Sequence, residues 1–421
     1  MLAAKKFSAS LLAALTLSWP LPLPAQENPL SLAEALDIAV RDSMLLAAQR
    51  SAIIAAGESS VSARELPDPK LKFGIENLPL DGPDKYSITR EFMTMRRIGV
   101  AQEFLRAGKR EIKGRRADHQ LAREQVMLDD TRAALRRDVA TTWTERYFAE
   151  QMAKTIDEQY AETALQRDTL HAGVATSRNL TSERLALEVA LQTLLDRRAE
   201  FDRQSARAQA MLSRWLGDAA RRPLSPLAPL SSLPQLAAAA AVHAAHHPHL
   251  QSLERQIDIA QSEADLAKAA TKPDWGVELS YAQRGPAYSN MLSVQVSIDL
   301  PLFADKRQHR EAAARAAQVE QARALREDAL RQHRAEAAAA QAEWDVASVR
   351  LKRFDEALLP LARDRVTLAL AAYRGGLSPL ATVLEARRME IDLRLQKLQL
   401  AAEQGRARAQ LTYFLPEEAA K

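Results

Sequence analysis

Cysteine is absent from the 421 residues of this sequence. Without thiols the chain cannot form disulfides, thiolate metal sites, a cysteine nucleophile or a thioether-linked lipid anchor. Glycine and aromatic residues are scarce too, with 13 glycines and 5% aromatics, while the helix formers Ala, Leu, Gln, Glu and Arg fill most windows. This composition favours long helices over a compact α/β enzyme.

Excess charge and long apolar runs are also lacking. The 58 Lys and Arg residues against 54 Asp and Glu give a net charge of +4, which excludes a nucleic-acid binder whose affinity comes from bulk positive charge. Beyond the N-terminal region, the longest apolar run is 236–245, which is mostly alanine. A membrane helix needs about 20 apolar residues, so strands are the segments expected to cross a membrane if the chain does so.

Sequence signatures of catalysis are missing. The chain contains no glycine-rich phosphate loop after a strand, no HExxH and no GxSxG. Its acidic residues are spread among Arg and Lys along helical stretches, a pattern typical of solvated faces with intrahelical ion pairs. We therefore expect no catalytic residues, no cofactor and no enzymatic activity.

The N-terminus indicates export from the cytoplasm. Lys5 and Lys6 precede an apolar stretch, 7–23, that is broken by prolines near its end, and polarity begins after Ala25. This pattern predicts a signal peptide over 1–25. An uncleaved membrane anchor is the alternative, which the prolines and the short apolar run disfavour.

The chain repeats itself at an offset of 206 residues, which separates Pro67-Asp68 from Pro273-Asp274. Each proline follows an amphipathic helical segment and precedes a stretch of alternating apolar and polar residues. The apolar series are Leu71, Phe73 and Ile75 in the first half, and Trp275, Val277 and Leu279 in the second. Alternation resumes after a turn-rich loop in each half, so we predict two β-hairpins, 70–104 and 274–303.

Long helices follow both hairpins. A helix from Lys109 to Ala172 would extend about 95 Å, which no globular core needs. The returning segments show apolar spacings of four and three residues, which predict narrow coiled-coil seams that hold helices together. The main seam residues are Leu187, Leu191, Leu194 and Leu212 in the first half, and Leu384, Ile391, Leu395 and Leu398 in the second. Pro360 should kink or interrupt the second outgoing helix.

The order helix, β-hairpin, helical hairpin thus occurs twice, over 26–222 and 223–421, with the helical hairpins at 105–220 and 304–415. The predicted fold class is mainly α with transmembrane β: two structural repeats with long coiled-coil helical hairpins and four strands per chain. Four strands cannot close a barrel, and open edges in hydrocarbon leave backbone groups unpaired. Since single-chain barrels begin at about eight strands, copies of the chain must share one.

Several strings carry a family resemblance. The doubled organisation, the proline before each first strand, LPLFADKR from Leu300 and GGLSPLATVLEAR from Gly375 resemble the TolC family of outer-membrane efflux ducts. The resemblance implies a homotrimer with a shared 12-stranded β-barrel in outer-membrane lipid and a periplasmic α-barrel. It also implies a tip that docks a periplasmic adaptor (membrane fusion) protein within a tripartite pump driven by an inner-membrane RND transporter.

Two further strings resemble the CzcC/CusC-like branch, which serves heavy-metal RND pumps: PDPKLKFGIENLP from Pro67 and AQEFLRAGKRE from Ala101. The expected cargo is therefore heavy-metal cations. A general drug or small-molecule duct and a soluble periplasmic coiled-coil adaptor are the alternatives. The chain departs from some relatives in having no lipidated cysteine, and in placing Thr382 where others have an acidic residue.

The two helical-hairpin turns are the candidate docking sites. They contain Gly173 and Val174 in the first half and Gly376 and Leu377 in the second, and they match the tip at which the family engages its adaptor. Loops that end rigid coiled coils are well placed to present contacts. Plain turns without a docking role are the alternative.

A histidine cluster and a methionine pair are the candidate metal ligands. His243, His246, His247 and His249 lie within seven positions, and helical spacing would place the first three on one face. We favour a helix break at HHPHL over a metal site. Met93 and Met95 would share a face if extended, and thioethers suit Cu(I), but contact with lipid or filling of a gap is the preferred interpretation.

Overall fold

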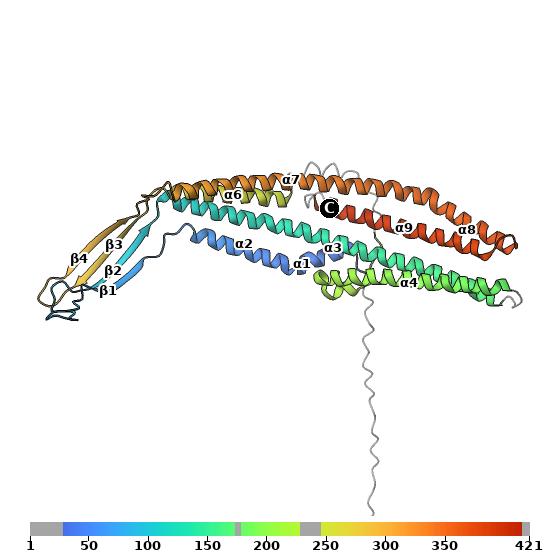
Figure 1. The fold of residues 1–421 in the computed structure, drawn as a ribbon, viewed down its shortest axis with the longest axis horizontal. Coiled ribbons are helices and arrows are strands. Elements are labelled where there is room, and N and C mark those ends of the chain that lie inside the picture. The colour runs from blue at the N-terminus through green and yellow to red at the C-terminus, as the bar shows by residue number, and fades with distance from the viewer. Residues whose placement is uncertain (1–27, 173–177, 228–245, 415–421) are drawn as a thin grey trace, which may run out of the picture.

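The computed structural model describes residues 28–172, 178–227 and 246–414, so the predicted signal peptide lies outside the described residues. The molecule is elongated, with a four-stranded sheet at one end and long helices running away from it (Figure 1). The helices are α1 (Leu32–Asp42), α2 (Met44–Ser62), α3 (Ala107–Ala172), α4 (Arg178–Leu216), α6 (Pro248–Ala269), α7 (Gln308–Arg353), α8 (Leu359–Arg374) and α9 (Leu380–Tyr413). The strands are β1 (Lys70–Glu76), β2 (Met95–Phe104), β3 (Trp275–Gln283) and β4 (Met291–Ile298).

The first long helix is continuous. α3 contains 66 residues and extends about 100 Å at 1.5 Å per residue, which confirms the prediction made for Lys109 to Ala172. α4 runs back along it (Figure 1). Leu187, Leu191 and Leu212 of α4 are buried, so the predicted seam is structural. None of the described helices has the length and apolar composition required to span a membrane.

The second outgoing helix is interrupted, as Pro360 predicts. α7 ends at Arg353, one π-helical turn covers Phe354–Leu358, and α8 then begins at Leu359 with Pro360 in its first turn. Proline has no N–H to donate, and its ring crowds the carbonyl one turn back, so a helix start accommodates it better than a helix interior. α9 returns alongside α8 and α7 (Figure 1).

The four strands form one antiparallel sheet in the order β1-β2-β3-β4. Val100 of β2 lies opposite Leu71 of β1 and Leu279 of β3, and Leu279 lies opposite Val294 of β4. The β2–β3 pairing joins the two predicted hairpins, although about 170 residues separate their strands in sequence. β1 and β4 are edge strands of this single chain.

Apolar packing in the middle of the molecule joins α1, α3 and α4. Trp143 of α3 is fully buried there, in a cluster with Leu46, Val139, Leu212 and Leu216. Smaller clusters nearer the helical turns join three helices each, such as that of Ile156 of α3, Leu194 of α4 and Ile391 of α9.

Candidate functional site

The helical hairpin of the second half ends in a tight turn between α8 and α9. The Gly376 N–H donates to the Tyr373 carbonyl at 3.0 Å, and the Leu377 N–H donates to the Ala372 carbonyl at 2.9 Å. This pair of bonds is a Schellman motif, which needs the left-handed φ of 71° that Gly376 adopts. The backbone therefore fixes the turn without help from the Leu377 side chain.

Leu377 projects from this turn with 86% of its surface exposed. Directly behind it, Leu380, Val383 and Leu187 pack into a buried cluster between α9 and α4. A large apolar side chain on a rigid base is a suitable contact for another protein. Adaptor docking by Gly376 and Leu377 remains a prediction, and Gly173 and Val174 lie outside the described residues.

The sheet at the other end has two chemically different faces. Residues opposite one another in neighbouring strands share a face, and one face is apolar and exposed. It carries Leu71, Phe73 and Ile75 of β1, Ile98 and Val100 of β2, Leu279 and Tyr281 of β3, and Leu292, Val294, Val296 and Ile298 of β4. A continuous exposed apolar surface of this kind marks a lipid or protein contact.

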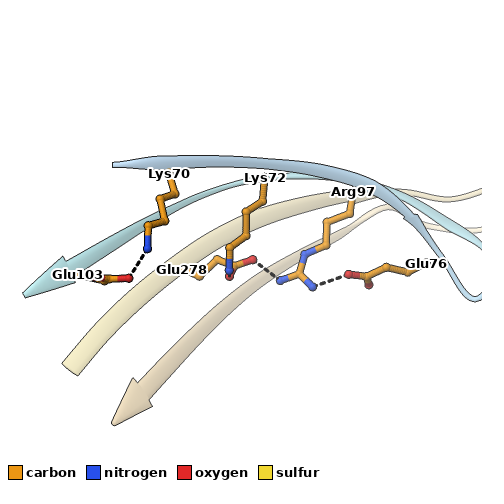
Figure 2. Close-up of polar contacts among 6 residues, drawn as sticks. All are labelled: Lys70, Lys72, Glu76, Arg97, Glu103 and Glu278. Carbon is orange, nitrogen blue, oxygen red and sulfur yellow. Dashed lines mark hydrogen bonds and ion pairs between the residues drawn. The ribbon is translucent and has the colours of Figure 1, made fainter. Parts of the chain in front are cut away.

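The opposite face carries an ion-pair network, shown in Figure 2. Glu278 accepts from Lys72 at 2.7 Å and from Arg97 at 2.7 Å, and Arg97 also donates to Glu76 at 2.6 Å. Lys70 and Glu103 form a separate pair on the same face. Three cations therefore neutralise three carboxylates, which makes this face hydrophilic without leaving a set of free carboxylates to hold a metal ion.

The network connects positions that the sequence repeat relates to each other. Lys72 and Glu278 are 206 residues apart, the offset that separates the two halves. Lys72 lies opposite Gly99, where an added Cβ would lie 2.7 Å from the Ser280 Cβ. Sequence analysis missed this contact, although opposite charges at repeat-equivalent positions were the signal that could have revealed it.

A second ion pair anchors the junction between strand and helix. The buried Lys109 side chain donates to Asp274 at 2.8 Å and to the Lys272 carbonyl at 2.8 Å. Asp274 also accepts from the Arg106 backbone N–H at 3.1 Å. The Pro273-Asp274 motif therefore fixes the start of β3 against the start of α3, which is a structural role.

His247 links the ends of two helices. Its Nδ1 accepts from the His249 N–H at 3.2 Å and so caps α6, while its Nε2 lies 3.0 Å from the Tyr413 carbonyl at the end of α9. The neutral ring with its proton on Nε2 satisfies both contacts. Burial lowers the pKa of His247 to about 4, so the neutral form is held at neutral pH.

His246 and His247 do not lie on a helical face, which agrees with the helix break favoured at HHPHL. Pro248 occupies the first position of α6, which leaves His246 and His247 before the helix, and His243 lies outside the described residues. His249 instead contacts Asp130 at 3.2 Å, and this hydrogen bond raises the pKa of the imidazole. A histidine that sequence reasoning did not single out, His333 of α7, stacks on His249 with 5.3 Å between ring centroids.

No group of three or more His, Asp or Glu side chains in the described ranges has the geometry of a metal site. The two methionines do not both lie in a strand. Met93 lies in the loop before β2, where its N–H donates to Glu91, and only Met95 belongs to the strand. The expectation of a shared strand face therefore fails for this pair.

We expect acid to weaken the junction at His247. Because its pKa is lower in the folded chain than the ordinary 6.5, the unfolded state takes up the proton first as the pH falls. The free energy of unfolding should therefore decrease between pH 6.5 and about 4, by about 3 kcal/mol per chain. His333, whose pKa burial also lowers, acts in the same direction. His249 opposes it, because its contribution is complete below 6.5 and is lost as the pH rises through its raised pKa.

The check is the thermal midpoint of detergent-solubilised protein at pH 7 and pH 4.5. His247→Gln should show a smaller loss on acidification than the original chain, whereas His246→Gln, altered at an exposed position, should keep the full loss. If the thermal midpoint of His247→Gln falls on acidification as much as that of the original chain, a group other than His247 is responsible for the acid sensitivity. Asp130, Arg137, Glu336 and Tyr413 are the other ionisable groups around this junction.

The comparisons agree with the architecture. Residues 239–415 match the family model "Outer membrane efflux protein". A search of curated proteins finds no match. The crystal structure of CusC, described for its transmembrane channel formation, superposes with a TM-score of 0.77 at 15% identity, over 91% of this chain and 92% of CusC.

Two other solved structures are similar to the chain to the same degree. The outer membrane protein VceC from Vibrio cholerae gives a TM-score of 0.76 at 16% identity, over 91% of this chain and 95% of VceC. The MtrE outer membrane channel from Neisseria gonorrhoeae gives 0.74 at 15% identity, over 91% and 88%. The fold expected from the sequence, with long helical hairpins and four strands, is therefore confirmed, and the second half of the chain matches the outer membrane efflux protein family.

Proposed function

We propose, from the match of residues 239–415 to the outer membrane efflux protein family and from the fold, that the chain is the passive outer-membrane duct of a tripartite RND-type efflux pump. Proteins of that family are channels, so the proposal is an efflux channel and not an enzyme. The observation that carries the proposal is the two-faced sheet joined to long helices, of which α3 extends about 100 Å.

The sheet supports a shared barrel. An apolar face suits lipid and a charged face suits an aqueous lumen, yet β1 and β4 each present one unpaired edge in the single chain. Unpaired backbone groups cost several kcal/mol each in hydrocarbon. Pairing β4 of one copy with β1 of the next removes both edges, and three copies would close twelve strands. We therefore propose a homotrimer with its sheet in the outer membrane.

The helices support a periplasmic extension. α3, α4, α7 and α9 are too long to lie within a bilayer core of about 30 Å, and the helices extend away from the sheet in one direction (Figure 1). We propose that the turn at Gly376 and Leu377 meets the periplasmic adaptor at the far end, that residues 1–25 direct export, and that 26–222 and 223–421 are the two repeats. A soluble adaptor fits less well, because the two helical hairpins alternate with strand pairs that join in one sheet.

We propose heavy-metal cations as the cargo. The support is the resemblance of the strings from Pro67 and Ala101 to the CzcC/CusC-like branch. In the structure, the string from Pro67 forms β1 and the turn before it, and the string from Ala101 forms the junction between β2 and α3. Because the charged face of the sheet is neutralised, the duct itself would conduct the cation without binding it, and the partner pump would select it.

Deleting the gene should reduce tolerance to copper, zinc or cobalt ions more than tolerance to organic drugs. The measurement is the minimum inhibitory concentration in a strain with no second duct, with the intact gene restored on a plasmid as the control. Replacing His246, His247 and His249 with Gln should leave metal tolerance near that of the original chain if the protein folds. A sharp loss of drug tolerance with unchanged metal tolerance would overturn the metal cargo and leave general efflux.

A further inference from the structure

Three helices meet the sheet at one of its ends (Figure 1). α3 follows β2, α6 precedes β3, and α7 follows β4. α6 packs against both α3 and α7, which brings the three connections together. We call these connections and the adjoining helical turns the basic junction, which comprises residues 105–116, 268–274 and 299–310.

An apolar rim lies where the sheet meets the basic junction. Phe104 and Trp275 lie opposite each other at the end of the apolar face, with 4.5 Å between the centroids of their stacked rings. Beyond β4, the side chains of Leu300, Leu302 and Phe303 are exposed. Aromatic residues in such places lie at the level of the lipid headgroups in membrane proteins. With the sheet in the outer membrane, as proposed above, this rim marks the depth at which the hydrocarbon ends.

The basic junction has a large excess of positive charge. Its three segments contain eleven Lys or Arg residues and four Asp or Glu residues. The neighbouring segment 63–69, which connects α2 to β1, adds one Arg, one Asp and one Glu, so most of the excess remains. A local excess of positive charge of this kind attracts anions.

Most of these cations have no partner within the chain. Lys109 pairs with Asp274, and Arg116 pairs with Glu263. The other nine side chains are exposed and make no hydrogen bond or ion pair with any residue that the structure describes. They are Arg106, Arg110, Lys113, Arg115, Lys268, Lys272, Lys306, Arg307 and Arg310. Lys and Arg side chains only donate hydrogen bonds, so the partner that suits them is an anion with several oxygen acceptors.

The basic side chains lie within reach of the lipid headgroups. Arg110 and Arg310 belong to the first turns of α3 and α7, and Lys306 lies two residues before α7. One helical turn rises about 5.4 Å, which is comparable with the headgroup layer of about 5–7 Å on each side of the hydrocarbon core. Long Lys and Arg side chains can also extend along apolar surface and bring their charge to this layer. The rim and the cations together therefore match a membrane surface.

We propose that the basic junction binds the phosphate headgroups of anionic phospholipids in the outer-membrane leaflet nearest the helices. This inference rests on the function proposed above, because it needs the sheet to lie in that membrane. Phosphate oxygens accept charge-assisted hydrogen bonds from Arg and Lys, and clusters of about four to eight Lys or Arg beside a membrane-spanning segment are typical of anionic lipid binding. A zwitterionic headgroup carries a cation that the junction repels, so anionic lipid is preferred.

Trp275 provides the readout, because it lies at the apolar rim while the other described tryptophans, Trp143, Trp215 and Trp344, belong to helices. The full chain is reconstituted into vesicles that mix phosphatidylcholine with phosphatidylglycerol, one of which is brominated near the headgroup. Bromine quenches the fluorescence of a tryptophan that it contacts, so the two quenching curves give the relative affinity of the two lipids beside Trp275. At low salt, phosphatidylglycerol should bind about fivefold more strongly, which is the effect of one Lys or Arg at an anionic surface. The preference should disappear in about 1 M NaCl, where the Debye length is about 3 Å.

A chain with Arg110→Gln, Lys306→Gln and Arg310→Gln should lose most of the preference, with an affinity ratio of about two or less. The matched control replaces Arg334, Arg350 and Arg353 with Gln, because these are exposed arginines of α7 farther from the sheet. It removes the same charge and should keep the preference. Trp275→Phe should lose the lipid-dependent quenching, which assigns the signal to the rim. Arg110→Gln alone, with a partial loss of preference, serves if the triple variant does not assemble.

Failure of this inference is distinguishable from failure of the duct. Equal affinity of the two lipids in the original chain would overturn the inference and leave the duct intact, because lipid would still contact Trp275. A preference that survives in the triple variant or in 1 M NaCl would overturn it as well. Absence of quenching by either lipid would mean that the sheet does not lie in the bilayer, which would overturn the inference together with the proposed function.

Discussion

Export should fail when Gly376 and Leu377 are replaced by Arg and Glu, while the trimer still assembles. The Leu377 side chain is 86% exposed, so its replacement removes little internal packing. An Arg at the left-handed position of Gly376 costs about 1–2 kcal/mol, a strain that the buried cluster around Leu380 can tolerate. Two new charges at the proposed contact would instead prevent an apolar docking surface from forming. Cargo tolerance should therefore fall to the level of the strain from which the gene is deleted.

The measurement compares cargo tolerance with the amount of trimer recovered from the outer membrane. Leu325→Glu is a matched control, because Leu325 is an exposed leucine of α7 far from the turn, and it should leave both quantities unchanged. Loss of trimer in the turn variant would mean that the Schellman motif holds the fold and does not dock a partner. Normal cargo tolerance in the turn variant would show that the turn is not part of the docking site.

Val294→Arg should abolish recovery of the trimer from the outer membrane, whereas Gln295→Arg should not. The two residues are neighbours near the centre of β4, and Val294 belongs to the apolar face while Gln295 lies opposite Glu278 on the charged face. An Arg on the lipid face near the bilayer midplane costs about 2–4 kcal/mol, and a trimer carries that cost three times. An Arg beside Glu278 meets a carboxylate and an aqueous lumen.

Detergent extraction and size analysis of the outer-membrane fraction provide the check. The original chain and Gln295→Arg should both give a trimer. Equal recovery of Val294→Arg would show that the apolar face does not contact lipid, and equal loss of both variants would show only that β4 tolerates no change. The adjacent substitutions therefore test which face lies outward as well as whether the sheet is needed.

Features set by short-range pattern were predictable from the sequence. Helix length followed from the absence of proline between 84 and 222, the interruption at Pro360 from the chemistry of proline, and the strands from alternation. The helix break at HHPHL has the same local origin, because Pro248 starts α6 and leaves His246 and His247 before the helix.

Features set by contact between distant segments were not predictable. The stacking of His333 on His249 depends on how α7 lies against α6, and the close approach of Gly405 to Thr144 depends on how α9 lies against α3. Nothing in the composition of these helices indicates these approaches. Which side chains meet is decided by packing, and a single sequence without known packing does not specify it.

The contact between Lys72 and Glu278 has a consequence for symmetry. The two residues hold equivalent places in the two halves, yet they meet at 2.7 Å with opposite charges. If both halves carried the same residue there, two lysines or two glutamates would face each other across Gly99. A chain made of two identical halves therefore could not form this sheet without repulsion at this point. The two halves must therefore carry opposite charges at this position for the two hairpins to join. Hairpins with the same charge there would repel each other as the sheet forms.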